Sequence, residues 1–205
     1  MNVFPTKGNL INTKKSLGLA RLGFELLDRK RNILVREMMM LIDTANAVQN
    51  EIDETYHEAY LALQTANITL GMCGEIGQEI PVDTSVNITF RSIMGVEIPM
   101  VTIDNPEIRP TYGLNTSNSL LDEAYLKFNK VKKLTAQLSE IENSVYRLAD
   151  AVKKTQKRAN ALRNIMIPRF EETVKYITAA LEEKDREEFS RLKVIKAQKL
   201  KNDEV

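Results

Sequence analysis

The sequence predicts an all-α dominated fold, a long antiparallel two-helix coiled coil with a small β-hairpin inserted between the helices. Aromatic residues are only 6% of the 205 residues and tryptophan is absent, so a globular core has few large side chains available. Apolar residues recur at alternating spacings of three and four along two long stretches, as in coiled coils. Between these stretches lies a short segment of alternating apolar and polar residues, which is typical of strands.

The first long stretch predicts a helix over about residues 10–75. Its fourteen seam positions are apolar except at Arg31 and Thr55. They are Leu17, Ala20, Phe24, Leu27, Arg31, Leu34, Met38, Leu41, Ala45, Val48, Ile52, Thr55, Ala59 and Ala62. About six unbroken heptads exceed the three or four that indicate a coiled coil. A cluster of glycines and then Pro81 follow, so the helix is expected to end between Leu70 and Gly77.

The middle of the chain predicts a β-hairpin over about residues 84–103. Residues 86–90 and 96–101 alternate and are rich in β-branched side chains, and Met94-Gly95 lies between them. Because a proline has no N–H to donate, Pro99 restricts the second strand to an edge. Such a short connection makes the flanking helices antiparallel, and the three parts together are expected to form a single elongated domain.

The second long stretch predicts a helix over about residues 117–198, after a loop over residues 104–116. Thr116, Ser117 and Ser119 are candidate N-caps. Its eleven seam positions are apolar except at Thr155. They are Val131, Leu134, Leu138, Ile141, Val145, Leu148, Val152, Thr155, Ala159, Leu162 and Met166.

The seam of the second helix becomes irregular near its C-terminal third. From Met166 the spacing is four and four through Phe170 to Val174, a stutter that locally relaxes a left-handed supercoil. Pro168 lies within this stretch and is expected to kink or loosen the helix. It should lie opposite residues 12–32, which include the seam charge Arg31, so packing there is expected to be imperfect.

Charge is segregated along the chain. Residues 37–90 contain nine acidic and no basic residues, residues 153–169 contain six basic and no acidic residues, and residues 1–31 contain seven basic against two acidic residues. The coiled coil is therefore expected to be basic towards its termini and acidic on the first helix near the hairpin. The net charge of +1 gives no overall reason to expect binding to nucleic acid or to a membrane surface.

No catalytic, cofactor or metal site is expected. His57 is the only histidine and has no Ser or Cys nucleophile placed beside it, and the single cysteine, Cys73, is read as a small apolar filler. Residues 71–77 are rich in glycine but lack the spacing and the lysine of a phosphate-binding loop, so they indicate helix termination. The acidic residues of the first helix have no pocket in a thin seam that could gather them around a cation.

Binding to nucleic acid and direct membrane insertion are likewise not expected. The basic segment 153–169 has no interleaved aromatic residues on which bases could stack. No run of about 18 apolar residues is present, and no apolar signal-peptide region follows the N-terminus. These features predict a cytoplasmic protein that is attached to a membrane only through a partner.

Several motifs in the chain resemble a known family. The segment from Lys157 to Pro168 contains a basic residue, one further residue and then Asn-Ala-Leu, and it ends in Ile-Pro. Arg-Leu-Lys occurs at residues 191–193, and Pro-Thr-Lys occurs at residues 5–7 near the N-terminus. These motifs, together with the interposed hairpin, resemble the D subunit of the V-type and archaeal A-type rotary ATPases over nearly the whole chain. Arg163 stands where the family usually has an acidic residue.

The resemblance implies a non-catalytic rotor shaft in the central stalk. Such a shaft transmits torque between a head of catalytic A and B subunits and a membrane ring that moves H⁺ or Na⁺. It binds the small F subunit of the stalk and a ring-coupling subunit of the C or d type, and it carries no cofactor. The complex is expected to be peripheral to the cell membrane on its cytoplasmic side.

Two surfaces are candidates for these contacts. A basic collar is predicted to face acidic loops of the stator and consists of Arg29, Lys30, Arg31, Arg36, Lys153, Lys154, Lys157, Arg158, Arg163 and Arg169. The acidic part of the first helix and the hairpin are predicted to contact the small F subunit. An alternative for the same pattern is a prefoldin-like coiled-coil chaperone or scaffold, which would need exposed apolar residues at its termini, whereas residues 199–205 are mostly charged.

Overall fold

The computed structural model describes residues 4–78, 80–82, 84–103, 112–113 and 117–202. Its elements are the helices α1 (Lys7–Leu70) and α2 (Gly74–Gln78), the strands β1 (Val86–Ile93) and β2 (Val96–Ile103), and then α3 (Ser119–Ala161), the π-helical turn η1 (Leu162–Met166) and α4 (Ile167–Asn202). The predicted fold class is confirmed, with long helices and a two-stranded antiparallel sheet between them. The predicted loop at 104–116 lies outside the described residues except for Tyr112 and Gly113.

Helix α1 begins and ends at identifiable caps. The Thr6 hydroxyl oxygen accepts a hydrogen bond from the Asn9 backbone N–H at 3.2 Å, as an N-cap does. At the other end Gly71 has a φ of 81°, the left-handed conformation that commonly follows the last turn of a helix. The helix therefore ends at Leu70, within the predicted interval.

Helix α3 has a different cap from the predicted ones. The Asn118 side-chain oxygen accepts the Leu121 backbone N–H at 3.1 Å, so Asn118 is the N-cap. Ser117 and Ser119 are not the N-cap, because Ser119 is already the first helical residue, and Thr116 lies outside the described residues. Asparagine is as good a cap as serine, and its side chain also donates to the Thr69 hydroxyl at 2.9 Å.

The chain divides into two compact units, one of residues 1–31 with 154–205 and one of residues 32–153. In the first unit Arg21 pairs with Glu171 and Arg31 with Gln156. In the second unit Tyr56 contacts Thr135, and Thr69 contacts Asn118. In both units, residues later in α1 contact residues earlier in the second long helix. The helices are therefore antiparallel within each unit.

The predicted seams are the buried faces of these helices. All fourteen positions on α1 are buried or half-buried, and so are ten of the eleven on the second long helix. The exception is Met166, which is 38% exposed. Met166 belongs to η1, where the Ile167 N–H bonds to the Leu162 carbonyl five residues back. This wider turn rotates Met166 out of the seam, and Phe170, Val174, Ile177 and Leu181 return to it.

The π turn explains how Pro168 fits inside a long helix. A proline has no N–H for the carbonyl four residues earlier, and its ring crowds that carbonyl. Here the turn immediately before Pro168 is widened, so the predicted loosening takes the form of a π insertion. In the same unit Arg21 pairs with Glu171, and a Cβ at Gly23 would lie 3.7 Å from Leu162. The residues around Pro168 thus lie against part of the predicted window 12–32.

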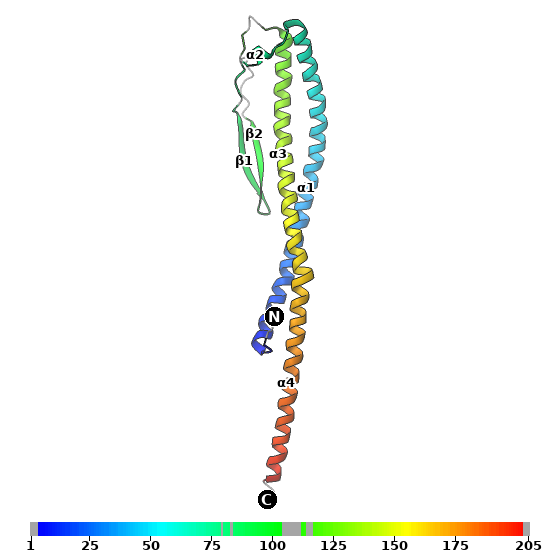
Figure 1. Cartoon of the computed structure of the whole chain (residues 1–205), viewed down its shortest axis with the longest axis vertical. Coiled ribbons are helices and arrows are strands. Elements are labelled where there is room, and N and C mark those ends of the chain that lie inside the picture. Colours follow the sequence, from blue (N-terminus) through cyan, green and yellow to red (C-terminus); the bar gives the residue numbers. More distant parts are fainter. Residues whose placement is uncertain (1–3, 79, 83, 104–111, 114–116, 203–205) are drawn as a thin grey trace. The chain divides into compact units, whose positions relative to one another are not determined.

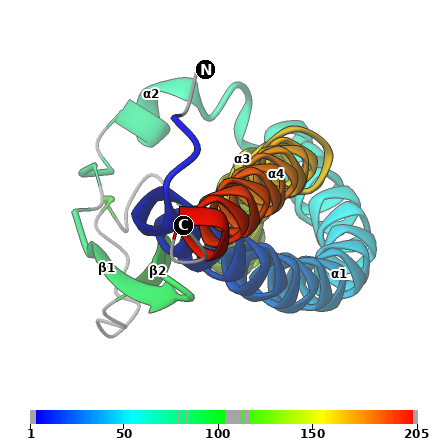
Figure 2. The ribbon, with the colours of Figure 1, turned by 90° about the horizontal axis from the view of Figure 1, so that it is seen from below.

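In the unit of residues 32–153, the middle part of α3 lies between the hairpin and α1 (Figures 1 and 2). The strands pair from Val86–Ile103 to Ile93–Val96, and the two connecting residues have positive φ angles, 51° at Met94 and 75° at Gly95. Both angles match a type I′ turn, whose twist suits a two-residue hairpin. Ile98 of β2 is buried with Leu34 of α1 and Leu148 of α3, which anchors the hairpin to both helices.

Candidate functional site

The collar residues lie on the outward faces of the helices. Eight of the ten collar residues belong to the unit of residues 1–31 with 154–205, and Arg36 and Lys153 belong to the other. All are exposed except Lys30 and Arg31, which are half-buried. The heptad explains this, because the seam takes the apolar positions and leaves the basic ones on the solvent side.

Arg31 is the exception that occupies the seam itself. Its guanidinium is within 2.7 Å of the Asp28 carboxylate, one turn earlier on the same helix, and donates to the Gln156 side-chain oxygen at 2.9 Å. A half-buried charge needs such partners, because the seam offers it little water. Arg31 therefore interrupts the apolar seam as predicted, and its charge is directed into the helix pair.

Arg163 is placed by an aromatic ring. Its guanidinium carbon lies 5.8 Å from the centre of the Phe24 ring, within the range of a cation–π contact. Phe24 is half-buried in the seam, and Arg163 is exposed in the π turn. The contact holds a basic side chain across the helix pair at the place where α-helical geometry is broken.

The hairpin offers a second surface, built by hydrogen bonds along one edge. The Val101 backbone N–H donates to Glu140 at 2.8 Å, the Pro99 carbonyl accepts from the Ser144 hydroxyl at 3.5 Å, and the Glu97 carbonyl accepts from Arg147 at 3.1 Å. These three α3 side chains are spaced by four and three residues, so they share one helix face. They bond to one outward backbone group at each of three residues along the outer edge of β2.

Sequence reasoning missed this contact. The only available signal was the polar stripe of Glu140, Ser144 and Arg147 at helical spacing, and such a stripe usually marks a solvated face. Pro99 was correctly restricted to an edge, and its carbonyl is one of the three groups that α3 binds. The stripe becomes informative only when the strand that it faces is known.

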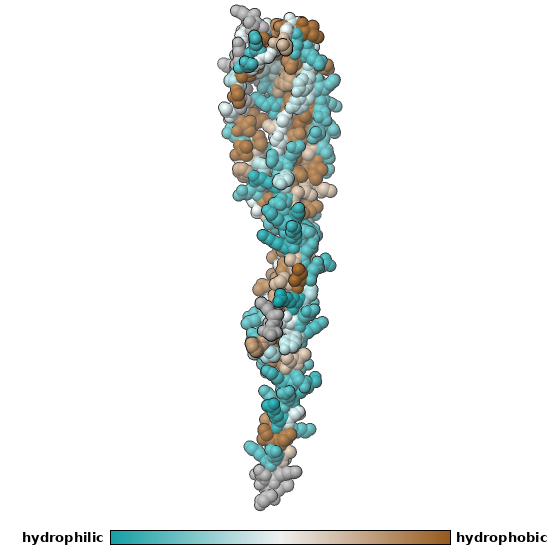
Figure 3. Space-filling view, viewed as in Figure 1, coloured by the Kyte–Doolittle hydropathy of each residue, from teal (hydrophilic) through white to brown (hydrophobic). Residues whose placement is uncertain are grey.

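The opposite strand, β1, presents an apolar strip. Val86, Ile88 and Phe90 are 44%, 60% and 58% exposed. They line an open groove of about 430 Å³ together with β2 and the exposed side of α3, and Figure 3 shows apolar side chains gathered over the hairpin. Arg147 adds a positive charge 5.4 Å from the centre of the Phe90 ring.

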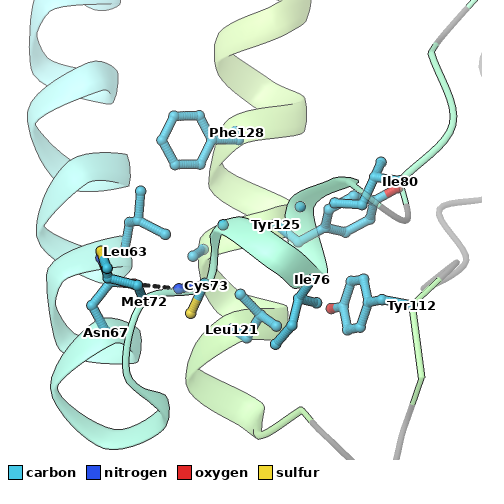
Figure 4. Close-up of a pocket in the computed structure, with 13 residues that line it drawn as sticks. Leu63, Asn67, Met72, Cys73, Ile76, Ile80, Tyr112, Leu121, Tyr125 and Phe128 are labelled. Carbon is cyan, nitrogen blue, oxygen red and sulfur yellow. Dashed lines mark hydrogen bonds between the residues drawn. The ribbon is translucent and has the colours of Figure 1, made fainter.

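An apolar pocket of about 500 Å³ lies where α1 ends (Figure 4). Leu63, Ile76, Leu121 and Phe128 contribute to its wall, and its described lining residues include no acidic or basic side chain and no histidine. Cys73 is half-buried there, and its backbone N–H donates to the Asn67 side chain at 3.2 Å. The short helix α2, which the sequence did not predict, forms part of this wall.

Tyr112 closes the same region. It is 4% exposed and donates a hydrogen bond to the Asp122 carboxylate in the first turn of α3. Burial, and then this hydrogen bond, raises the pKa of Tyr112 above its ordinary value. Both effects keep the hydroxyl neutral, so Tyr112 ties its segment to α3 as a hydrogen-bond donor.

Three features of the described residues concern metal-binding groupings, the environment of histidine and membrane-spanning helices. No group of three His, Cys, Asp or Glu side chains in the described part of the chain could hold a metal ion. His57 is exposed on α1. Among the described helices, none combines the length and apolar character needed to cross a bilayer.

Comparison with known proteins identifies the family. A family model described as the D subunit of ATP synthase matches residues 9–197. The D subunit of the V-type ATP synthase of Thermotoga neapolitana is 47% identical over 198 residues, covering 96% of this chain and 98% of the relative.

The D subunits of the A-type ATP synthases of Thermococcus kodakarensis and Pyrococcus furiosus are 37% and 34% identical, each over 202 residues, 96% of this chain and 94% of the relative. These matches confirm the resemblance carried by the Asn-Ala-Leu and Ile-Pro motifs and leave the prefoldin-like alternative without support. The chain belongs to the family of ATP synthase D subunits, whose matched relatives include both V-type and A-type proteins.

Proposed function

We propose that this chain is the non-catalytic central shaft of a V/A-type ATPase or ATP synthase. It transmits torque between the A and B subunits of the head and the ion-translocating ring, with a ring-coupling subunit of the C or d type between shaft and ring. The observation that carries the proposal is family membership over nearly the full chain, in a protein whose long helices bury largely apolar seams. The complex is peripheral to the cell membrane on the cytoplasmic side.

The paired helices suit this task. A shaft must resist twisting, and two helices packed along a seam resist it better than a single helix. It must also favour one state of each catalytic site in turn, which requires contacts that differ between those states. Exposed charges are suitable, because ion pairs at a surface contribute only about 0.2–1 kcal/mol each and exchange readily.

The basic collar is the surface proposed to face the stator. Lys157, Arg158 and Arg169 are exposed residues of the same unit. Replacing all three with glutamine should remove roughly 0.6–3 kcal/mol of contact with acidic stator loops. The reconstituted complex should then hydrolyse ATP with weaker coupling and rotate with lower torque.

A matched control lies in the same unit. Lys193, Lys196 and Lys199 of α4 are also exposed, and replacing them with glutamine removes the same charge outside the collar. Torque and coupling are measured by single-molecule rotation and by ATP-driven ion transport. Equal effects of the two triple variants, or no effect of the collar variant, would refute the collar.

The hairpin and the acidic part of α1 are proposed to bind the small F subunit of the stalk. Nine acidic residues and no basic ones occur in residues 37–90, and the hairpin is anchored rigidly through Ile98. Deleting the hairpin should weaken binding of the F subunit and lower ATPase activity. A pull-down and an activity assay that both match the unaltered complex would contradict this assignment.

A further inference from the structure

The two outer edges of the hairpin differ in what covers them. The two-residue turn closes on the Ile93–Val96 pair, so ladder hydrogen bonds recur at every second pair from there. Residues at the pairs between, such as Phe90–Pro99 and Ile88–Val101, direct their backbone C=O groups and, except at proline, their N–H groups outward. Each strand therefore has a row of backbone groups available to a neighbour.

On β2 this row is occupied by α3. Glu140, Ser144 and Arg147 bond to the outward groups of Val101, Pro99 and Glu97. On β1 the equivalent groups of Ile88 and Phe90 form no backbone hydrogen bond with any other described residue beyond the hairpin itself. The hairpin thus has one covered edge and one open edge.

The open edge has few of the features that normally prevent strand pairing. Proteins protect free edges with proline, lysine, bulges or very short strands. β1 is eight residues long, pairs in continuous register, and contains neither proline nor lysine. Its alternate side chains Val86, Ile88 and Phe90 are exposed.

The charges on and beside β1 indicate which kind of partner segment would be complementary. β1 contains no acidic residue, and its single charge is Arg91. Arg147 of α3 lies against Phe90 and adds a second positive charge beside the strand. A segment that pairs with β1 is complementary when it has apolar residues at every second position and carboxylates nearby.

We propose that β1 binds an extended segment of the small stalk subunit as a third strand of the sheet. Main-chain hydrogen bonds to Ile88 and Phe90 supply the recognition, and the partner's alternate apolar side chains cover the strip of Val86, Ile88 and Phe90. This inference rests on the proposed function for the identity of the partner. It adds the mode of binding, which is pairing with a strand edge.

The decisive comparison is between Ile88→Pro and Ile88→Ala. Both variants shorten the exposed side chain, but only proline removes the outward N–H. The chain already accommodates Pro99 at the equivalent kind of position on β2, so the hairpin should tolerate proline at residue 88. Affinity of the full chain for the purified stalk subunit is measured by calorimetry, and Ile88→Pro should weaken it at least tenfold more than Ile88→Ala. Equal affinities of the two variants overturn strand pairing.

Hydrogen exchange on the unaltered chain provides a test that does not depend on folding of a variant. The amides of Ile88 and Phe90 should exchange rapidly in the free chain and slow at least tenfold in the complex. The ladder amides of Thr89 and Arg91 serve as internal controls, because they are protected in both states. Unchanged exchange at Ile88 and Phe90 in the complex overturns the proposal.

Three further outcomes are diagnostic. If the chain neither binds the stalk subunit nor assembles with the A and B subunits, the proposed function itself fails. If it binds and assembles but Ile88 and Phe90 stay unprotected, only the strand pairing fails. Protection that rises with the concentration of the chain alone assigns the edge to a second copy and also overturns the proposal.

Discussion

Replacing Ile98 with alanine removes the apolar contact by which the hairpin is anchored to the helices. Ile98 is 1% exposed and packs with Leu34 and Leu148, which are both fully buried. Three buried carbon groups at about 0.8 kcal/mol each, plus the cavity left behind, predict a loss of about 3 kcal/mol. Because 1.4 kcal/mol is a factor of ten, this loss corresponds to a roughly hundredfold change in an opening equilibrium.

The substitution should destabilise docking of the hairpin more than it destabilises pairing of the helices. After the substitution the hairpin is still held by the packing of Ile93 and Val96 against the same cluster. Its three edge hydrogen bonds to α3 also remain, and each contributes about 0.5–1.5 kcal/mol. The hairpin should therefore open without unfolding of α1 and α3. Native-state hydrogen exchange measures this directly, because ladder amides report hairpin opening and amides at Ile52 and Val131 report opening of the helices.

The expected result is exchange about a hundredfold faster at the ladder amides, with a much smaller change at Ile52 and Val131. The matched control is Ile88→Ala on the exposed side of β1, where Ile88 is 60% exposed and the change should stay within about 0.5 kcal/mol. Equal acceleration in the helices would refute the anchoring role, and so would unchanged exchange in the hairpin.

Two other sites give independent predictions. Met94 has a φ of 51°, so Met94→Asn should slow exchange of the ladder amides about fivefold, since asparagine tolerates this conformation better by about 1 kcal/mol. Met94→Ala is the control, and equal slowing in it would contradict the argument. The raised pKa of Tyr112 predicts stability that is complete below the ordinary value near pH 10 and is lost as the pH rises above it. Tyr112→Phe should be about 1 kcal/mol less stable at pH 7 and lose less stability between pH 9 and 11 in urea titrations, and an unchanged pH slope would contradict the assignment.

The helix seams could be predicted because burial on a helix repeats with a period that is visible in the residues. The period fails at Met166, since spacings of four and four fit either a relaxed supercoil or a wider turn. The structure has the wider turn, at η1 just before Pro168. Proline marks where a helix is irregular, but the form of the irregularity depends on packing against the partner helix.

The surfaces were less predictable than the seams. The collar positions follow from the heptad, and eight of the ten are exposed, but the half-burial of Arg31 depends on contacts with Asp28 and Gln156. The hairpin could be predicted from alternation, whereas its attachment through Glu140 depends on where the strand lies in space. Contacts between elements that are distant in sequence leave no local pattern.

The open edge of β1 has a consequence for how cells make this protein. A newly synthesised chain that has not met its partners exposes an eight-residue strand without proline or lysine, and such edges pair readily with one another. Unassembled copies should therefore be the form most prone to aggregation and to degradation by quality-control proteases. Production matched in amount and time to that of the other subunits would keep this orphan population small.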